Sequence, residues 1–331
     1  LFLAYCSIAV INLNYFYLSY FRNTKNAKDN IKYKIAEAVL AISFSLFIVI
    51  CLRGGIMGLI LGDLLASAAI FCILTGRFLT FMKPCFSWPI LNESLKICYP
   101  LTPRLFFKMI GNQFDKYLIG LLNTAGGVGI YSIGQKIAGI GFTFMTALEN
   151  VFIPEVYKRM FSPDPKDSDT IGKYLTPFMY VSIAAALMIS LFTEEAIYIL
   201  TPKSYHGISD IAAILSMFYG IMFFAKQPQL LFAKRIGIIS FLTIFGILLN
   251  TGINIPFIRT WGAVGAAWAA LLAGLISAAI SFMISQYYYP IRWEYKRTAI
   301  IFFMFFGFSI LTLILKGWGM GYELRFPVKC L

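Results

Sequence analysis

Long apolar stretches alternate with short polar connectors along the whole chain. The stretches are about 20 residues or longer, which is the length at which an α-helix crosses the hydrocarbon core of a bilayer. The alternating signal of a transmembrane β-barrel does not occur, so we predict an all-α polytopic membrane protein. The ten predicted spans are residues 1–21, 32–52, 55–80, 100–122, 127–156, 172–192, 208–233, 235–256, 262–288 and 297–316.

Basic residues concentrate in every second connector, which predicts the orientation of the chain. Connectors rich in Lys and Arg lie on the cytoplasmic side of a membrane protein. The first, third, fifth, seventh and ninth connectors are the basic ones, so the chain is expected to start near the outer face. Their basic residues are Arg22, Lys25, Lys28, Lys32, Lys34, Arg77, Lys83, Lys96, Lys158, Arg159, Lys166, Lys173, Lys226, Lys234, Arg235, Arg292, Lys296 and Arg297; the opposite side carries Arg53, Lys203, Arg259 and Lys316.

Composition agrees with a membrane protein and argues against several other classes. The chain is 59% hydrophobic and 13% charged, against about 25% charged residues in a soluble domain. The net charge of +13 lies in connectors beside apolar spans and not on one basic stripe, so anionic lipids are the expected partners and nucleic acid is not. The six cysteines are scattered, and His206 is the only histidine. We therefore expect no metal, no cofactor and no catalytic triad, and the protein is not expected to be an enzyme.

The segment 81–99 differs from the spans around it and marks the best domain boundary. Two prolines open it, and Leu91, Leu95 and Tyr99 follow at helical spacing. Such a segment is typical of an amphipathic helix that lies in the membrane interface. We interpret it as a linker between two helical bundles.

Placing an ionisable residue in the hydrocarbon core of a membrane costs free energy. The span 100–122 nevertheless carries four ionisable residues, as well as Asn112. At 100° per residue, Arg104, Lys108 and Asp115 fall within about 40° of one another on the helix. Arg104 lies near the cytoplasmic end and could simply extend its side chain to the interface. The functional interpretation is a water-filled cavity whose cationic side contacts a phosphate, with Lys116 beside it.

Three further ionisable residues have both a structural and a functional interpretation. Lys136 either pairs with Asp115, extends to the interface or contacts substrate. Glu149 either pairs with a nearby basic residue or serves coupling. Asp63 is either a coupling-ion site or the partner of a helix that the chain lacks, and the second interpretation is slightly favoured.

Residues 104–160, from "RLFFKMIGNQFDKYLIG" to "IPEVYKRM", resemble the seventh and eighth helices of polysaccharide biosynthesis flippases, which include the O-antigen exporters. The matching elements are Asp115-Lys116, Tyr131-Ser132 after "GGVGI", Lys136 in "GQKIA", and Pro154 with Tyr157-Lys158. The stretches "YFRNTKNAKDNIKY" (20–33) and "WGAVGAAWAAL" (261–271) resemble the loop after the fourth helix and the start of the twelfth. The resemblance covers nearly the whole chain.

The resemblance implies two six-helix lobes around a central cavity, in a protein of fourteen helices of which this chain holds the fourth to the thirteenth. It would thus be truncated at both ends. The implied domains are residues 1–80 (second half of the N-terminal lobe), 81–99 (linker), 100–288 (C-terminal lobe) and 289–331 (one more helix and the start of another).

The implied activity moves an undecaprenyl-diphosphate-linked oligosaccharide from the cytoplasmic to the outer leaflet of the bacterial inner membrane by alternating access. Arg104, Lys108, Asn112 and Lys136 would contact the headgroup. Asp115, Lys116, Asp63 and Glu149 would be structural or would couple transport to Na⁺ or H⁺. A multidrug exporter of the same superfamily, an oligosaccharide polymerase and a scaffolding protein are the alternatives, of which the first is the strongest.

Overall fold

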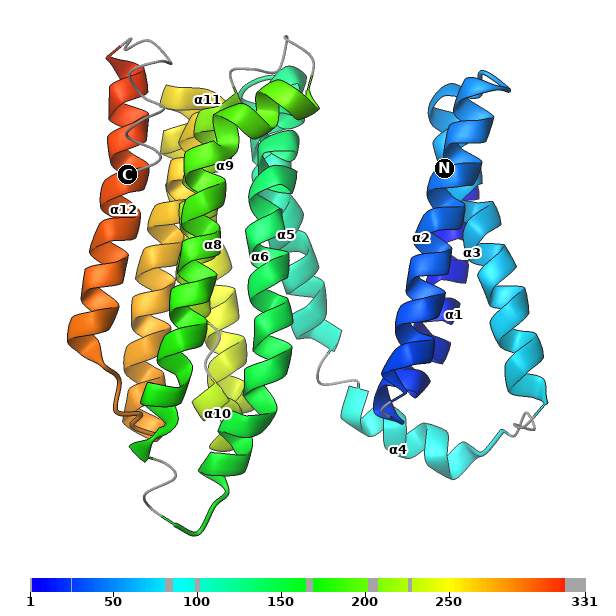
Figure 1. Ribbon diagram of the computed structural model, residues 1–331, viewed down its shortest axis with the longest axis horizontal. Helices are drawn as coiled ribbons and strands as arrows, with labels where there is room; N and C mark the ends of the chain where they lie inside the picture. Colours follow the sequence, from blue (N-terminus) through cyan, green and yellow to red (C-terminus); the bar gives the residue numbers. More distant parts are fainter. Residues whose placement is uncertain are drawn as a thin grey trace. The chain divides into compact units, whose positions relative to one another are not determined.

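The computed structural model describes residues 2–24, 26–80, 86–98, 102–164, 169–201, 208–225 and 228–318 (Figure 1). Nearly all of these residues are helical and none forms a strand, so the all-α prediction is confirmed for them. The helices are α1 (Phe2–Asn23), α2 (Ala27–Ile50), α3 (Gly55–Leu79), α4 (Trp88–Cys98), α5 (Thr102–Leu122), α6 (Ala125–Met160), α8 (Ile171–Leu200), α9 (Ser209–Ala225), α10 (Pro228–Phe232), α11 (Ile236–Tyr288) and α12 (Tyr295–Gly317).

Each of the ten predicted spans overlaps a helix within the described ranges. Eight helical segments are long and apolar enough to cross a membrane, with α11 counted once and α5, which carries four charged residues, left out. The predicted ends of the helices were less accurate than the prediction that each helix exists. Helix α2 begins at Ala27 and not at 32, and α8 continues to Leu200, past the predicted end at 192.

Helix α11 consists of two antiparallel halves that meet at Gly262. The backbone there has φ 59° and ψ −136°, a conformation that favours glycine. A Cβ atom on Gly265 would lie 1.9 Å from the carbonyl oxygen of Phe257, and one on Gly246 would lie 3.2 Å from the hydroxyl of Ser277. These contacts pair residues on either side of the turn, so α11 is a helical hairpin that accounts for two predicted spans.

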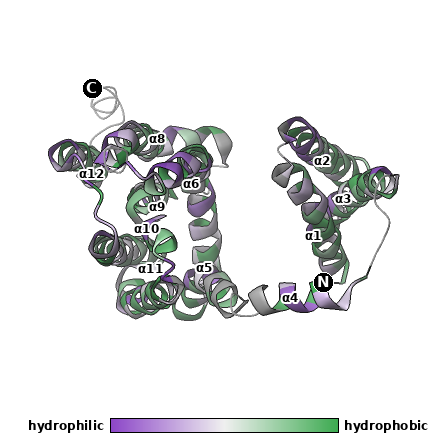
Figure 2. Cartoon of the chain, turned by 90° about the horizontal axis from the view of Figure 1, so that it is seen from below, coloured by the Kyte–Doolittle hydropathy of each residue, from purple (hydrophilic) through white to green (hydrophobic). Residues whose placement is uncertain are grey.

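The chain divides into two compact units, Leu1–Glu93 and Ser94–Leu331, and the division falls within α4. Helix α4 is amphipathic in sequence, and Figure 2 shows both hydrophilic and hydrophobic residues along it. Trp88, Ile90 and Leu95 are exposed on it. The assignment of the units to lobes of a larger protein, with the boundaries given above, stays a prediction.

The first unit is a bundle of α1, α2 and α3. Leu18, Ile70 and Leu74 form part of its apolar core. Helices α2 and α3 approach closely at Gly62, where an added Cβ would lie 2.3 Å from the Ser45 hydroxyl oxygen. Small residues permit such backbone contact between helices in a membrane.

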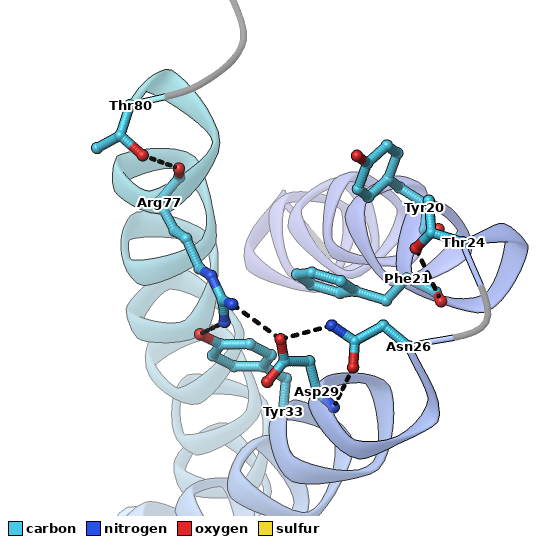
Figure 3. Close-up of polar contacts among 8 residues, drawn as sticks. All are labelled: Tyr20, Phe21, Thr24, Asn26, Asp29, Tyr33, Arg77 and Thr80. Carbon is cyan, nitrogen blue, oxygen red and sulfur yellow. Dashed lines mark hydrogen bonds and ion pairs between the residues drawn. The ribbon is translucent and has the colours of Figure 1, made fainter.

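An aromatic and ionic cluster ties the three helices of the first unit together at the end predicted to be cytoplasmic (Figure 3). The Arg77 guanidinium donates hydrogen bonds to the Asp29 carboxylate (2.8 Å) and to the Tyr33 hydroxyl (3.0 Å). It also lies over the rings of Phe21 and Tyr33, 5.5 and 5.9 Å from their centroids. Asn26 donates to the same carboxylate and caps α2, so one arginine joins α3 to both neighbouring helices.

The second unit contains α5, α6 and α8–α12, with α9 the most buried of its candidate spans. Tyr131, Met179 and Phe305 are among its largest fully buried side chains. Large apolar side chains also cover outward faces; Phe303 of α12, for example, is 81% exposed. Such faces are compatible with contact to lipid acyl chains.

Candidate functional site

A buried carboxylate, Asp115 of α5, forms the polar centre of the second unit. Its Oδ1 atom accepts hydrogen bonds from the side-chain amides of Asn250 (2.7 Å) and Asn254 (2.9 Å), both on the first half of α11. Its Oδ2 atom accepts one from the Tyr131 hydroxyl of α6 (3.1 Å). Asp115 is 8% exposed, and Tyr131 and Asn254 are 1% and 0% exposed. Three helices therefore supply one hydrogen-bonded network; we call these four residues the Asp115 centre.

Local structure explains how α5 and α6 bring Asp115 and Tyr131 together. The two helices are joined by a tight turn, in which the Thr124 hydroxyl caps α6 by accepting a hydrogen bond from the Gly127 amide (3.0 Å). Gly127 lies against Asn123 of the turn and Ile119 of α5, and a Cβ atom added there would lie only 3.0 and 3.1 Å from their side chains. The first turns of α6 therefore pack against the end of α5, which places Tyr131 beside Asp115.

The Asp115 centre contains two oxygen atoms that accept no hydrogen bond from the described part of the chain. The side-chain carbonyl oxygens of Asn250 and Asn254 are buried, and neither accepts a hydrogen bond from the described residues. The amide nitrogens of the same two side chains donate hydrogen bonds to the Asp115 carboxylate. Carboxylate, amide and hydroxyl oxygens are the donors that a hard cation prefers, although here the amide N–H groups and the tyrosine hydroxyl face the carboxylate. The arrangement suits a proton or a cation better than a phosphate.

The structure describes the side chains of only some of the cationic residues predicted to contact a headgroup. The side chains of Arg104, Lys108 and Asn112 lie outside the described part of the structure, so their expected shared face stays a prediction. Lys116 is partly exposed and donates to the Gln113 side chain (3.3 Å). Lys136 is exposed on α6 and forms no ion pair with Asp115, so that alternative is wrong.

Lys136 heads a row of polar residues along the exposed face of α6. Thr143 and Asn150 follow it at intervals of seven residues and are also exposed. Seven residues return a helix to nearly the same direction, so the three side chains share one face over about 21 Å. Lys136 itself lies about 17 Å along the axis from the start of α6, deep within a span. We call Lys136, Thr143 and Asn150 the α6 polar row.

The remaining predicted residues are not part of the Asp115 centre. Asp63 is exposed on α3 in the first unit, and Glu149 is half-buried on α6 next to the polar row. The nearby Glu155 pairs with Arg159 of the same helix (3.1 Å). Arg159 also lies over the Tyr174 ring, 4.4 Å from its centroid, and joins α6 to α8.

The model of a protein family described as "polysaccharide biosynthesis protein" matches residues 5–210 of this chain, which is more than half of it. The chain belongs to the polysaccharide biosynthesis protein family. The match runs from α1 to the start of α9 and thus includes Asp115, Tyr131 and the α6 polar row. The predicted resemblance is confirmed.

A curated relative from Haloferax volcanii, named as probable low-salt glycan biosynthesis flippase Agl15, is 24% identical over 285 residues. The alignment covers 78% of this chain and 59% of the relative. The chain thus spans little more than half of that protein's length. A solved structure of the lipid II flippase MurJ in an inward closed conformation is similar, with a TM-score of 0.72 and 16% identity, over 98% of this chain and 70% of that one.

Two further solved structures share the fold. One is a transporter of the MOP superfamily from Pyrococcus furiosus, with a TM-score of 0.64 and 16% identity over 84% of this chain and 66% of that one. The other is a multidrug resistance MATE family transporter of that superfamily, with a TM-score of 0.63 and 15% identity over the same shares. At these identities the likeness concerns the fold alone.

Sequence reasoning missed Asn250 and Asn254 in this family member. They lie in the segment "GILLNTGINIPF" and are not among the predicted site residues. The available signal was two amides at positions i and i+4 of an otherwise apolar span, which places both on one helix face. A polar pair of this kind needs a partner across the bundle, and Asp115 provides it.

Proposed function

We propose that the protein is a flippase that moves an undecaprenyl-diphosphate-linked oligosaccharide from the cytoplasmic to the outer leaflet of the bacterial cytoplasmic membrane. Family membership supports transport of this general kind, since the relatives are named as flippases or transporters and not as catalysts. The observation that carries the proposal is the α6 polar row, a cation and two hydrogen-bonding side chains exposed along a membrane-spanning helix.

The chemistry of the task fits this row. A diphosphate and a chain of sugars must cross about 30 Å of hydrocarbon, so their path needs water, cationic groups and hydrogen-bonding groups. Lys136 offers the charge for the diphosphate and Asn150 offers an amide for sugars. Thr143 offers an acceptor oxygen, since its hydroxyl donates to the Gly139 carbonyl (3.0 Å). Arg104, Lys108 and Asn112 of α5 are proposed to contact the headgroup as well.

Transport against a gradient needs an energy source, and the Asp115 centre is the proposed point of coupling. Na⁺ or H⁺ binding at Asp115 would neutralise a carboxylate that holds α5, α6 and α11 together through three hydrogen bonds. Occupancy of the centre would thereby bias the packing of these helices and the direction in which the substrate path opens. In this scheme the segment 81–99 is the tether between two lobes that rock against each other.

Substitution of Lys136 tests the substrate path. Lys136→Ala is expected to lower outer-leaflet delivery of a labelled lipid-linked oligosaccharide in proteoliposomes by about tenfold or more, because one charge-assisted contact is lost. Lys136→Arg should retain much of the rate. Lys158→Ala is the matched control, since Lys158 is exposed on the same helix at its predicted cytoplasmic end. Wild-type delivery by both Lys136→Ala and Lys108→Ala would refute the proposal.

A multidrug exporter is the second candidate, and two observations favour it. The fold resembles that of a MATE family transporter, and an intramembrane carboxylate at Asp115 is a group that a cationic drug pump would use. The same proteoliposomes distinguish the two functions. Uptake of a cationic dye that depends on Asp115, with no movement of lipid-linked oligosaccharide, would establish the second function and exclude the first.

A further inference from the structure

The first unit contains a second intramembrane polar centre, which no sequence motif predicted. Glu37 of α2 accepts hydrogen bonds at its Oε1 atom from the Asn14 amide of α1 (3.1 Å) and from the Ser67 hydroxyl of α3 (3.2 Å). The Asn14 amide also donates to the backbone carbonyl of Ser67 (2.9 Å). All three helices of the unit thus meet at one carboxylate, and we call Asn14, Glu37 and Ser67 the Glu37 centre.

Two features of this centre are unexplained by protein contacts alone. Asn14 is 1% exposed, and its side-chain carbonyl oxygen is buried without a hydrogen-bond partner among the described residues. Glu37 forms no ion pair within the described part of the chain, although it lies inside a membrane span. A buried carbonyl oxygen and a carboxylate without a counter-charge each carry a free-energy cost.

A single cation would remove both costs. The Asn14 amide nitrogen now lies between two oxygen atoms, Glu37 Oε1 and the Ser67 carbonyl, and its two N–H groups provide the positive charge density there. Rotation of the amide by 180° would exchange its nitrogen and oxygen, so that the Asn14 oxygen would lie close to Glu37 Oε1 and to the carbonyl and hydroxyl oxygens of Ser67. Hard cations prefer such oxygen donors. Because one carboxylate is the only charged group among these oxygens, the charge of the site matches that of a monovalent cation.

An apolar layer separates the Glu37 centre from the predicted cytoplasmic end of the unit. Leu18 follows Asn14 by one turn of α1, and Ile70 and Leu74 follow Ser67 along α3; all three are buried in the core. Beyond this layer lies the cluster of Arg77 shown in Figure 3. The centre is thus closed toward that end by core packing and by a fixed arginine, as an ion-binding site within a membrane bundle requires.

We propose that Asn14, Glu37 and Ser67 form a binding site for a small monovalent cation, for which Na⁺ is the probe. The site lies in the first unit, is separate from the Asp115 centre and does not depend on the proposed transport function. If the Asp115 centre also binds a cation as proposed above, the chain holds two cation sites, each built on a carboxylate and at least one asparagine amide.

Equilibrium binding of radioactive sodium to the purified protein tests the site. Asp115→Asn serves as the background, so that the second unit contributes no carboxylate. This variant is expected to retain sodium binding, and addition of Glu37→Gln is expected to weaken it by about tenfold or more, which corresponds to about 1.4 kcal/mol. The side chain keeps its size and can still accept from Asn14. Glu93→Gln, an equal change on the exposed surface of α4, is the control and should leave binding unchanged.

Ser67→Ala keeps the carboxylate and removes only the hydroxyl ligand, so it tests the site if Glu37→Gln does not fold; it should also weaken sodium binding. Equal sodium binding with and without Glu37→Gln, or no binding in the Asp115→Asn background, would overturn the proposal. Either result leaves the flippase function to be judged by oligosaccharide delivery. Sodium binding lost with Glu37→Gln in a protein that moves no oligosaccharide would support this site and refute the flippase.

Discussion

Two substitutions of Asp115 separate the structural role of its hydrogen bonds from the role of its charge. Asp115→Asn and Asp115→Leu both remove a buried negative charge, so the desolvation cost of that charge cancels when the two variants are compared. Asparagine still accepts from Asn250 and Asn254, and the Tyr131 hydroxyl can turn to accept from the new amide. Leucine accepts nothing, and the three donors lose their partner.

The expected difference in stability follows from these three donors. An unsatisfied buried donor costs about 1–3 kcal/mol, and values within membranes lie at the low end because donors find other partners there. Three donors at about 1 kcal/mol each make Asp115→Leu less stable than Asp115→Asn by about 3 kcal/mol. For a unit of this size that difference corresponds to a Tm lower by about 6–12 °C.

Thermal unfolding in detergent measures the stability difference, and sodium- or proton-driven delivery of labelled oligosaccharide measures the role of the charge. Equal Tm values for the two variants would refute the hydrogen-bond reasoning. Transport by Asp115→Asn at the wild-type rate would refute the coupling role and leave the structural one. A Tyr131→Phe substitution checks the network independently, because it should cost stability in the wild type and little or none in the Asp115→Leu background.

Two further predictions concern the first unit. Gly62→Ala should lower the Tm, because the added Cβ would lie 2.3 Å from the Ser45 hydroxyl oxygen. Gly76→Ala is the control: nothing lies within 4 Å of its added Cβ, so the Tm should stay unchanged or rise slightly. Equal effects of the two substitutions on the Tm would contradict the close packing of α2 on α3. Arg77→Ala should lower the Tm more than Asp29→Asn does, because the arginine also donates to the Tyr33 hydroxyl and stacks on two aromatic rings. A larger Tm decrease for Asp29→Asn would show that the ion pair dominates this cluster.

Most of the fold was predictable because its main determinant is local. A helix of about 20 apolar residues satisfies its own backbone hydrogen bonds, so each span can be identified without knowledge of its neighbours. Helix limits were less predictable, as α8 shows: Thr193 and Ile197 lie beyond the predicted end, yet they are 1% exposed. Packing against the bundle extends the helix there, and hydropathy alone does not contain that packing.

The candidate site was predictable only in part, and the two carboxylates show why. Asp115 was predictable as a site residue because a charged residue inside a span is unusual. Its partners did not, because Asn250 and Asn254 are neutral and lie far along the chain from it. Glu37 is also a charged residue inside a predicted span, but its partners Asn14 and Ser67 are neutral and lie on two other helices.

The sequence by itself determined that this chain crosses a membrane many times, where it does so and which family it resembles, because hydrophobicity over a span and the order of local motifs need no tertiary contacts. Only the tertiary structure decided which polar groups meet. It paired Asp115 with amides more than a hundred residues away, joined Glu37 to Asn14 and Ser67, and left Lys136 exposed and unpaired with Asp115, which was one of its three predicted roles. A buried charge must find hydrogen-bond partners wherever the packing of the helices supplies them, and that packing is a property of the whole bundle.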